Sequence, residues 1–83
     1  MTTAHKPPQA SSKDLRFSVE TEIETDGRWI AEIPEVPGAL AYGVTEEEAV
    51  KKAYAIALRA VADDVEQSRQ DPPHSIQLER AIA

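Results

Sequence analysis

Residues 15–33 read LRFSVETEIETDGRWIAEI, and this stretch decides the fold. Apolar side chains alternate with polar ones over its first ten residues and again over its last six. A period of two is typical of β-strands that bury one face. The Asp26-Gly27 pair lies between the two runs and indicates a turn. The sequence therefore predicts a β-hairpin with strands over residues 15–24 and 28–33.

The length of the loop sets the register of this hairpin. A two-residue loop at Asp26-Gly27 would place the apolar residues of the two strands on opposite faces. A three-residue loop over residues 25–27, with Gly27 in the left-handed region, places them on the same face, with Trp29 pointing inward. This register predicts the following cross-strand pairs: Ile23 with Trp29, Thr21 with Ala31, Val19 with Ile33, Glu24 with Arg28 as a favourable exposed pair, and Glu20 with Glu32 as an unfavourable one.

The segment after the hairpin contains a connection, a short strand and a helix start. Residues 34–38 (PEVPG) hold two prolines and a glycine, which predict a rigid connection. A short strand over residues 39–42 follows, and Gly43 is expected to break it. Thr45 and Glu48 have the spacing of a capping box, so a helix is predicted to start at Thr45. Its apolar residues recur every three or four positions for about 20 residues, which indicates an amphipathic helix lying on the sheet.

The chain is expected to end in one more strand. The prolines in residues 71–73 end the helical pattern, and apolar residues alternate with polar ones from Ile76 onward. The predicted fold class is α+β: a three-stranded antiparallel meander, one helix packed on it and a final strand. Residues 1–13 lack any periodic apolar pattern and are predicted to be a disordered lead-in. A single folded domain over residues 14–83 remains.

Composition limits what such a chain can do. A domain of 83 residues buries only about 60–65% of its unfolded surface, which allows one modest core and no cleft between two domains. Cysteine is absent, so disulfides, thiolate nucleophiles and sulfur-ligated zinc sites are excluded. No apolar run approaches the roughly 18 residues that span a bilayer, and no signal peptide is recognisable, so a cytoplasmic location is expected.

The charge of the chain points to a particular kind of partner. The formal net charge is −6, and residues 14–83 are more acidic still, because the first thirteen residues contribute Lys6 and Lys13 and no acid. Such a surface repels phosphate backbones, so direct binding of nucleic acid is not expected. A basic protein is the natural complement.

The sequence gives little support for an enzymatic function. A two-metal site needs several acids that converge on one point, and the predicted buried face offers none. His5 and His74 have no orienting acid that the sequence identifies. Glycine-rich phosphate loops and nucleophile elbows are absent. No catalytic residue, metal site or cofactor is therefore expected.

Two stretches together resemble the HicB-like antitoxin domain. Residues 29–39 read WIAEIPEVPGA, and residues 45–49 read TEEEA. A strand ending in IPEVPGA, a few residues of a third strand, and TEEEA opening a helix match that family in motif, spacing and order over roughly residues 17–65. The resemblance implies a partial ribonuclease-H-like topology and a HicA partner, a small basic toxin that cleaves messenger RNA. The antitoxin would cover the RNA-binding and catalytic surface of that toxin.

The resemblance also bears on assembly and on DNA. Proteins of this family commonly form homodimers or higher homo-oligomers. Many carry a C-terminal segment that binds the promoter of their own operon, but only residues 75–83 follow the last loop here. Direct DNA binding by this chain is therefore not expected. Similar domains also occur without an assigned toxin.

The candidate partner-binding residues fall into two sets. One set lies on the predicted outer face of the hairpin: Glu20, Glu22, Glu24, Ile30 and Glu32. These carboxylates would face a basic toxin, or they would only keep a solvated face acidic. The presence of Ile30 among them favours a contact role, because it would otherwise be an exposed apolar residue without a partner.

The other set is the rigid connection: Pro34, Glu35, Pro37 and Gly38. A pre-shaped loop loses little entropy on binding, although these residues also simply build the connection between two strands. The leading hypothesis is an antitoxin-like protein that neutralises a small basic ribonuclease by steric occlusion. The alternative is a self-associating structural or regulatory domain without a toxin, with Ile30 and the last strand at the subunit contact. A nucleic-acid-processing enzyme is a third possibility, and it would require metal-dependent cleavage.

Overall fold

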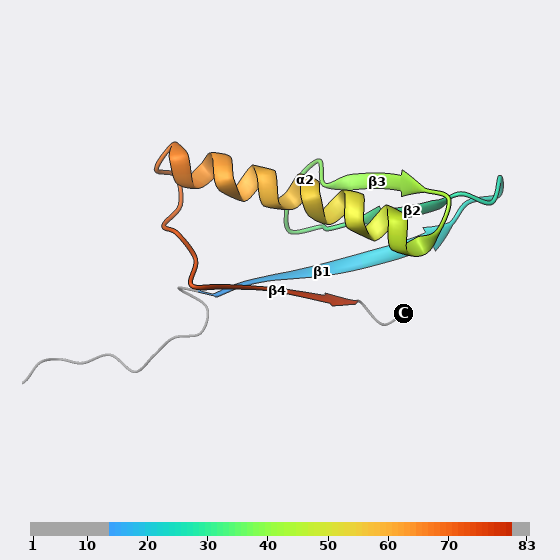
Figure 1. Cartoon of the computed structure of the whole chain (residues 1–83), viewed down its shortest axis with the longest axis horizontal. Helices are drawn as coiled ribbons and strands as arrows, with labels where there is room; N and C mark the ends of the chain where they lie inside the picture. Colours follow the sequence, from blue (N-terminus) through green and yellow to red (C-terminus); the bar gives the residue numbers. More distant parts are fainter. Residues whose placement is uncertain (1–13, 81–83) are drawn as a thin grey trace, which may run out of the picture.

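The structure, a computed structural model, describes residues 14–80 (Figure 1). The predicted disordered lead-in, residues 1–13, lies outside the described residues, as do residues 81–83. The elements follow the predicted order, which confirms the α+β class. They are β1 (Asp14–Ile23), β2 (Trp29–Glu32), β3 (Leu40–Gly43), the helix α2 (Glu46–Glu66) and β4 (Ser75–Arg80).

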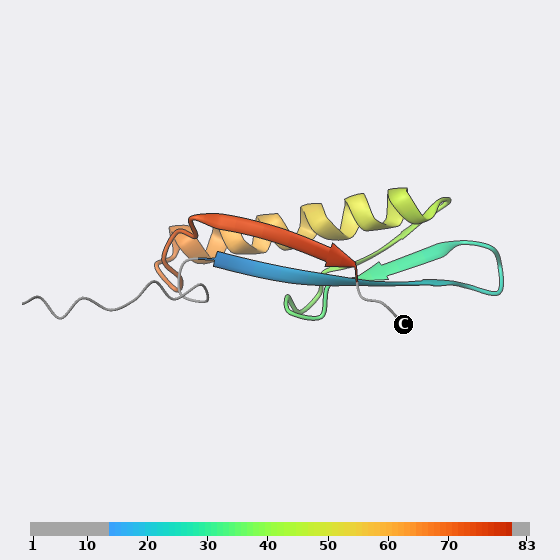
Figure 2. The same ribbon diagram turned by 90° about the horizontal axis from the view of Figure 1, so that it is seen from below.

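The four strands form one mixed sheet in the order β3-β2-β1-β4. The first three strands make the predicted antiparallel meander, and β4 lies parallel to β1 of the same chain, as Figure 2 shows. The helix α2 covers one face of the sheet, where it packs mainly on β3 and β2 and much less on β1 and β4 (Figure 1). We call the face under α2 the inner face and the opposite one the outer face.

The hairpin adopts the register that a three-residue loop predicts. Ile23 pairs with Trp29 and Glu20 with Glu32, and Gly27 has a φ of 90°, in the left-handed region. The ladder ends at the Glu20–Glu32 pair, so the predicted pairing of Val19 with Ile33 is wrong. The reason is that Pro34, which would lie opposite Ser18 in the next pair, has no amide to donate, and the Ser18 amide donates to the Glu35 carboxylate instead, at 2.9 Å.

The core lies between α2 and the inner face and consists of aliphatic side chains, many of them alanines, together with Phe17. The buried helix residues are mostly alanines, and their small side chains let α2 approach the strands closely. The approach is closest at Gly43, where an added Cβ would lie 2.5 Å from the backbone nitrogen of Ala49. Gly43 is therefore the buried last residue of β3 and does not break the strand before it, so β3 lies one residue later than predicted. The buried residues are Phe17, Val19, Ala31, Ile33, Ala39, Ala49, Ala53, Ala57 and Val61.

The start of α2 carries the predicted capping box in a modified form. The helix begins at Glu46, with Thr45 as its N-cap. The Thr45 hydroxyl accepts from the amide of Glu48 at 3.1 Å, and the Glu48 carboxylate accepts from the amide of Val44 at 2.6 Å. The carboxylate thus reaches one residue further back than in the usual motif. Both bonds satisfy amides that would otherwise lack a partner at the helix start.

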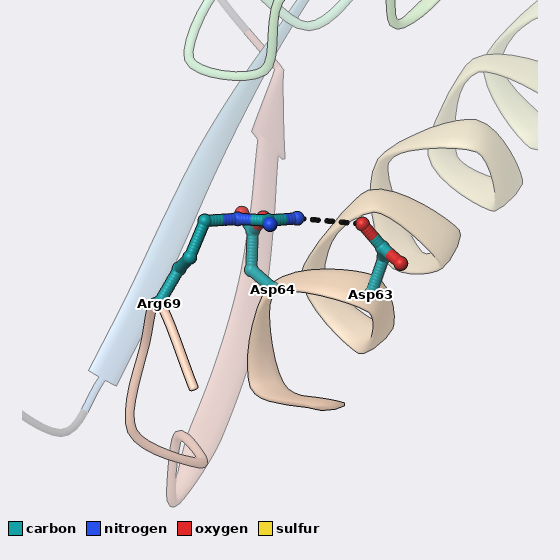
Figure 3. Close-up of polar contacts among 3 residues, drawn as sticks. All are labelled: Asp63, Asp64 and Arg69. Atoms are coloured by element: carbon teal, nitrogen blue, oxygen red, sulfur yellow. Dashed lines mark hydrogen bonds and ion pairs between the residues drawn. The ribbon is translucent and has the colours of Figure 1, made fainter. Parts of the chain in front are cut away.

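The end of α2 compensates for acidic residues in an unfavourable place. Asp63 and Asp64 lie near the negative end of the helix dipole. Ser68 adopts a left-handed φ of 60°, and the amide of Arg69 then donates to the carbonyl of Asp64 at 2.8 Å. This turn directs the Arg69 guanidinium back onto both carboxylates, at 2.7 Å from Asp63 and 3.0 Å from Asp64 (Figure 3). The loop toward β4 is thereby tied to the helix.

Candidate functional site

The predicted carboxylates of β1 and β2 lie together on the outer face. In the ladder Glu20 lies opposite Glu32, and Glu22 lies opposite Ile30. Side chains alternate between faces along a strand, and the neighbouring Val19 is buried in the core, so these residues point away from α2. All three glutamates are exposed, and Ile30 is half-buried.

Two further residues on this face extend the surface beyond what the sequence predicted. Tyr42 lies opposite Ile30, and Leu40 lies opposite Glu32, so both point outward from β3. Each is 39% exposed, which is high for a large apolar or aromatic side chain. The alternation of β3 was the available signal, but it assigns faces only once the register with β2 is known. We call the following set the outer patch: Glu20, Glu22, Ile30, Glu32, Leu40 and Tyr42.

The carboxylates of the outer patch have no cationic partner within the described part of the chain. Six residue pairs there form ion pairs, and none includes Glu20, Glu22 or Glu32. By contrast, Glu46 near the inner face contacts the Arg80 guanidinium at 2.7 Å. Two like charges directly opposite each other in a ladder are destabilising. The Glu20–Glu32 pair is therefore an unrelieved repulsion that a cationic partner would remove.

The hairpin end is organised differently from the prediction. The amide of Glu24 donates to the carbonyl of Arg28 at 2.7 Å, but the predicted ion pair between their side chains is absent. The Arg28 guanidinium instead contacts Asp26 at 2.9 Å and lies over the Tyr42 ring, 4.5 Å from its centroid. Hydrogen bonding from the backbone amide of Arg28 is the main cause that lowers the pKa of Asp26. Glu24 is half-buried and lies at the margin of the outer patch.

Glu35 has a structural task in the connection between β2 and β3. Its carboxylate accepts from the amide of Ser18 at 2.9 Å and from the Ser18 hydroxyl at 2.7 Å. If the β1–β2 ladder continued, Pro34 would lie opposite Ser18. Because the ladder ends before this pair, the Ser18 amide donates to the Glu35 carboxylate and not to β2. Partial burial raises the pKa of Glu35, but the hydrogen bonds from Ser18 outweigh it, and the net pKa lies below its ordinary value.

The connection borders the outer patch because Ser18 lies on the outer face, one pair beyond Glu20. Pro34 and Pro37 are exposed, and Gly38 is exposed with a left-handed φ of 87°. The structure thus brings four predicted residues of the hairpin together in the patch and places the connection alongside. Among the residues of the connection, Glu35 is one whose carboxylate already accepts hydrogen bonds within the fold, from Ser18.

Other kinds of site find no basis in residues 14–80. No group of three His, Asp or Glu side chains there could hold a metal ion. None of the helices in this part of the chain is both long and apolar enough to cross a membrane. Comparisons with models of protein families, with curated proteins and with solved structures found no match.

Proposed function

We propose that this chain is an antitoxin-like protein that binds a small basic mRNA-cleaving toxin of the HicA type and neutralises it sterically. The observation that carries the proposal is the outer patch, in which carboxylates that pair with no cation among residues 14–80 lie beside the exposed side chains of Leu40 and Tyr42. The sequence resemblance to the HicB-like domain supplies the class of partner. The chain has no role as a nuclease in this proposal.

The composition of the outer patch suits a protein interface. Protein contacts combine an apolar or aromatic centre with a polar rim. Here Ile30, Leu40 and Tyr42 supply the apolar part, and the glutamates lie beside them on the neighbouring strands. Arg28, stacked on Tyr42, demonstrates that a guanidinium fits against this ring. A basic partner could place an arginine or lysine near the glutamates while it buries the apolar side chains.

The charge of the patch predicts how the complex would form. Carboxylates clustered on one face attract a cationic protein over long range and raise the association rate at low salt. The relief of the Glu20–Glu32 repulsion would add to the affinity. The patch lies on strands, which hold their side chains in place before binding, so little entropy is lost on association.

The test is inhibition of RNA cleavage by a HicA-type ribonuclease encoded beside this chain. Wild-type protein should bind the ribonuclease and stop cleavage at stoichiometric ratios. The variant Glu20→Lys/Glu32→Lys reverses two charges at the centre of the patch. We expect it to weaken binding by more than about tenfold, because close opposite charges at interfaces couple by at least about 1.5 kcal/mol.

The matched control is Glu66→Lys/Asp71→Lys, which raises the net charge by the same amount at exposed positions near the end of α2. It should inhibit like the wild type. Circular dichroism verifies that both variants are folded. Loss of inhibition in both variants alike, or in neither, would contradict a role for the outer patch. Absence of any complex with the wild type would contradict the proposed function itself.

A further inference from the structure

Residues 1–13, which lead directly into β1, carry the opposite charge to the outer patch. They contain Lys6 and Lys13 and no acidic residue, so all 15 acids of the chain lie in residues 14–83. The described structure begins at Asp14, the first residue of β1. A cationic segment is thus joined directly to the strand that carries two of the three glutamates of the patch.

The outer patch retains negative charge that the described residues do not neutralise. Glu20, Glu22 and Glu32 take part in none of the ion pairs among residues 14–80. Arg16 and Arg28 lie on the same side of the hairpin, but each already contacts a neighbouring acid. Opposite charges attract over several ångströms at the protein surface. The patch therefore favours a further cation, and the same chain contains one in Lys6.

The segment is long enough to bring Lys6 to these carboxylates. Lys6 precedes Asp14 by eight residues, and an extended chain spans at most about 3.3–3.6 Å per residue, which gives a reach of about 26–29 Å. Glu20 lies six residues along β1 from Asp14, or about 20 Å at about 3.4 Å per residue. The difference leaves room for the chain to reverse direction. Lys13, which directly precedes Asp14, stays near the start of β1.

The residues that follow Lys6 favour such an arrangement. Pro7 and Pro8 each fix φ near −65°, and proline-rich segments are extended, with about 3.1 Å per residue. A segment that is extended before it binds loses less entropy on docking. The prolines would therefore span the distance between the start of β1 and the patch at a low entropic cost.

We propose that residues 1–13 run back over the outer face and place the Lys6 ammonium between the carboxylates of Glu20 and Glu32. Residues directly opposite in a ladder have Cβ atoms about 4.5–5.5 Å apart, so one ammonium with three donors can contact both carboxylates. The contact relieves the repulsion between the two glutamates. Residues 1–5 then lie beside Glu22 and Ile30, which are opposite each other in the same ladder.

This contact makes the segment an internal competitor for the outer patch. Exposed ion pairs are weak and are screened by salt, so the segment opens and closes readily. Any cationic protein that binds the patch must first displace it. The contact itself lies within one chain and does not depend on a ribonuclease partner.

Paramagnetic broadening of amide signals locates the segment in the full chain. The chain has no cysteine, so Thr3→Cys introduces a single thiol for a nitroxide label. In an undocked segment the label would lie on average about 17–20 Å from Asp14, and it would broaden mainly the start of β1. In the docked segment it lies beyond Lys6. We then expect the largest signal loss at Glu22 and Ile30.

Charge reversal within the labelled chain tests the role of Lys6. Lys6→Glu should abolish the signal loss at the outer patch, whereas Lys13→Glu, the same change in the same segment, should retain it. Combining Lys6→Glu with Glu20→Lys/Glu32→Lys should restore the loss, because the charges are then opposite again. Salt at about 1 M, where the Debye length is about 3 Å, should remove it from the chain with native charges. The amide spectra verify that each variant is folded.

Four outcomes would overturn the proposal. Signal loss confined to the start of β1, or strongest around the exposed Asp71, would place the segment elsewhere. Equal loss with Lys6 and with Lys6→Glu would remove the ion pair, and so would a combined variant that fails to restore the loss. A mixture of isotope-labelled chain and separate spin-labelled chain should show no loss at the patch, and a loss there would assign the contact to a second copy. Each of these results is independent of ribonuclease inhibition, which tests the proposed function separately.

Discussion

The two faces of the sheet use the same strands for opposite purposes. The inner face is a closely packed layer of small aliphatic residues under α2, with Ile33 fully buried at 0% exposure. The outer face carries carboxylates that have no cationic partner in the described residues 14–80, next to exposed side chains such as Tyr42. Folding is stabilised almost entirely by the inner face, because burial of apolar surface is the main favourable contribution. The outer face can therefore accept residues that cost stability and serve a partner.

The largest expected contrast is between two isoleucines only three residues apart. Ile33→Ala should lower the free energy of unfolding by about 2–5 kcal/mol, since it leaves a cavity in the core. Ile30→Ala on the outer face should cost about 1 kcal/mol or less, because that side chain is only half-buried. Urea unfolding followed by circular dichroism measures both. Equal losses for the two variants would contradict the assignment of the faces.

A smaller effect should separate stability from binding. Glu20→Lys replaces the like-charge pair with Glu32 by an opposite-charge pair, which should stabilise the fold by about 0.2–1 kcal/mol. The same change should weaken binding of the HicA-type ribonuclease. Unfolding curves and titration calorimetry on one preparation provide both values. A variant that becomes less stable, or that binds more tightly, would contradict the description of this pair.

The smallest effect concerns pH and the connection beside the patch. The pKa of Glu35 is lowered in the fold, so its ionised form stabilises the protein fully above its unfolded pKa of about 4.3. This contribution is lost as the pH falls through the lower folded value. Glu35→Gln should therefore show a shallower loss of stability below about pH 4.3 than the wild type. Parallel stability curves for the two proteins between pH 3 and pH 6 would contradict this role.

The sequence predicted the fold well because its local signals agree with one another. The alternation in β1, the Gly27 turn and the spacing of Thr45 and Glu48 each indicate the element that forms. The placement of Gly43 was wrong because a glycine in a strand suggests a break, whereas here it serves close packing against Ala49. Only the tertiary contact distinguishes these two uses of glycine.

The candidate site could be predicted only in part. The carboxylates of β1 and β2 follow from the hairpin register, but the contributions of Leu40 and Tyr42 depend on how β3 pairs with β2. The partners of Arg28 and Glu35 depend on side-chain geometry at the ends of strands, where several acceptors compete. A sequence pattern does not determine that competition.

The most direct test of the central claim is to map the contact surface by NMR while a HicA-type ribonuclease is titrated into the labelled chain. The account predicts the largest amide shift changes at the outer patch, above all at Glu20, Ile30 and Tyr42, with little change at the exposed helix residues Lys51 and Arg59. Changes concentrated on α2, with the outer patch unaffected, would contradict it.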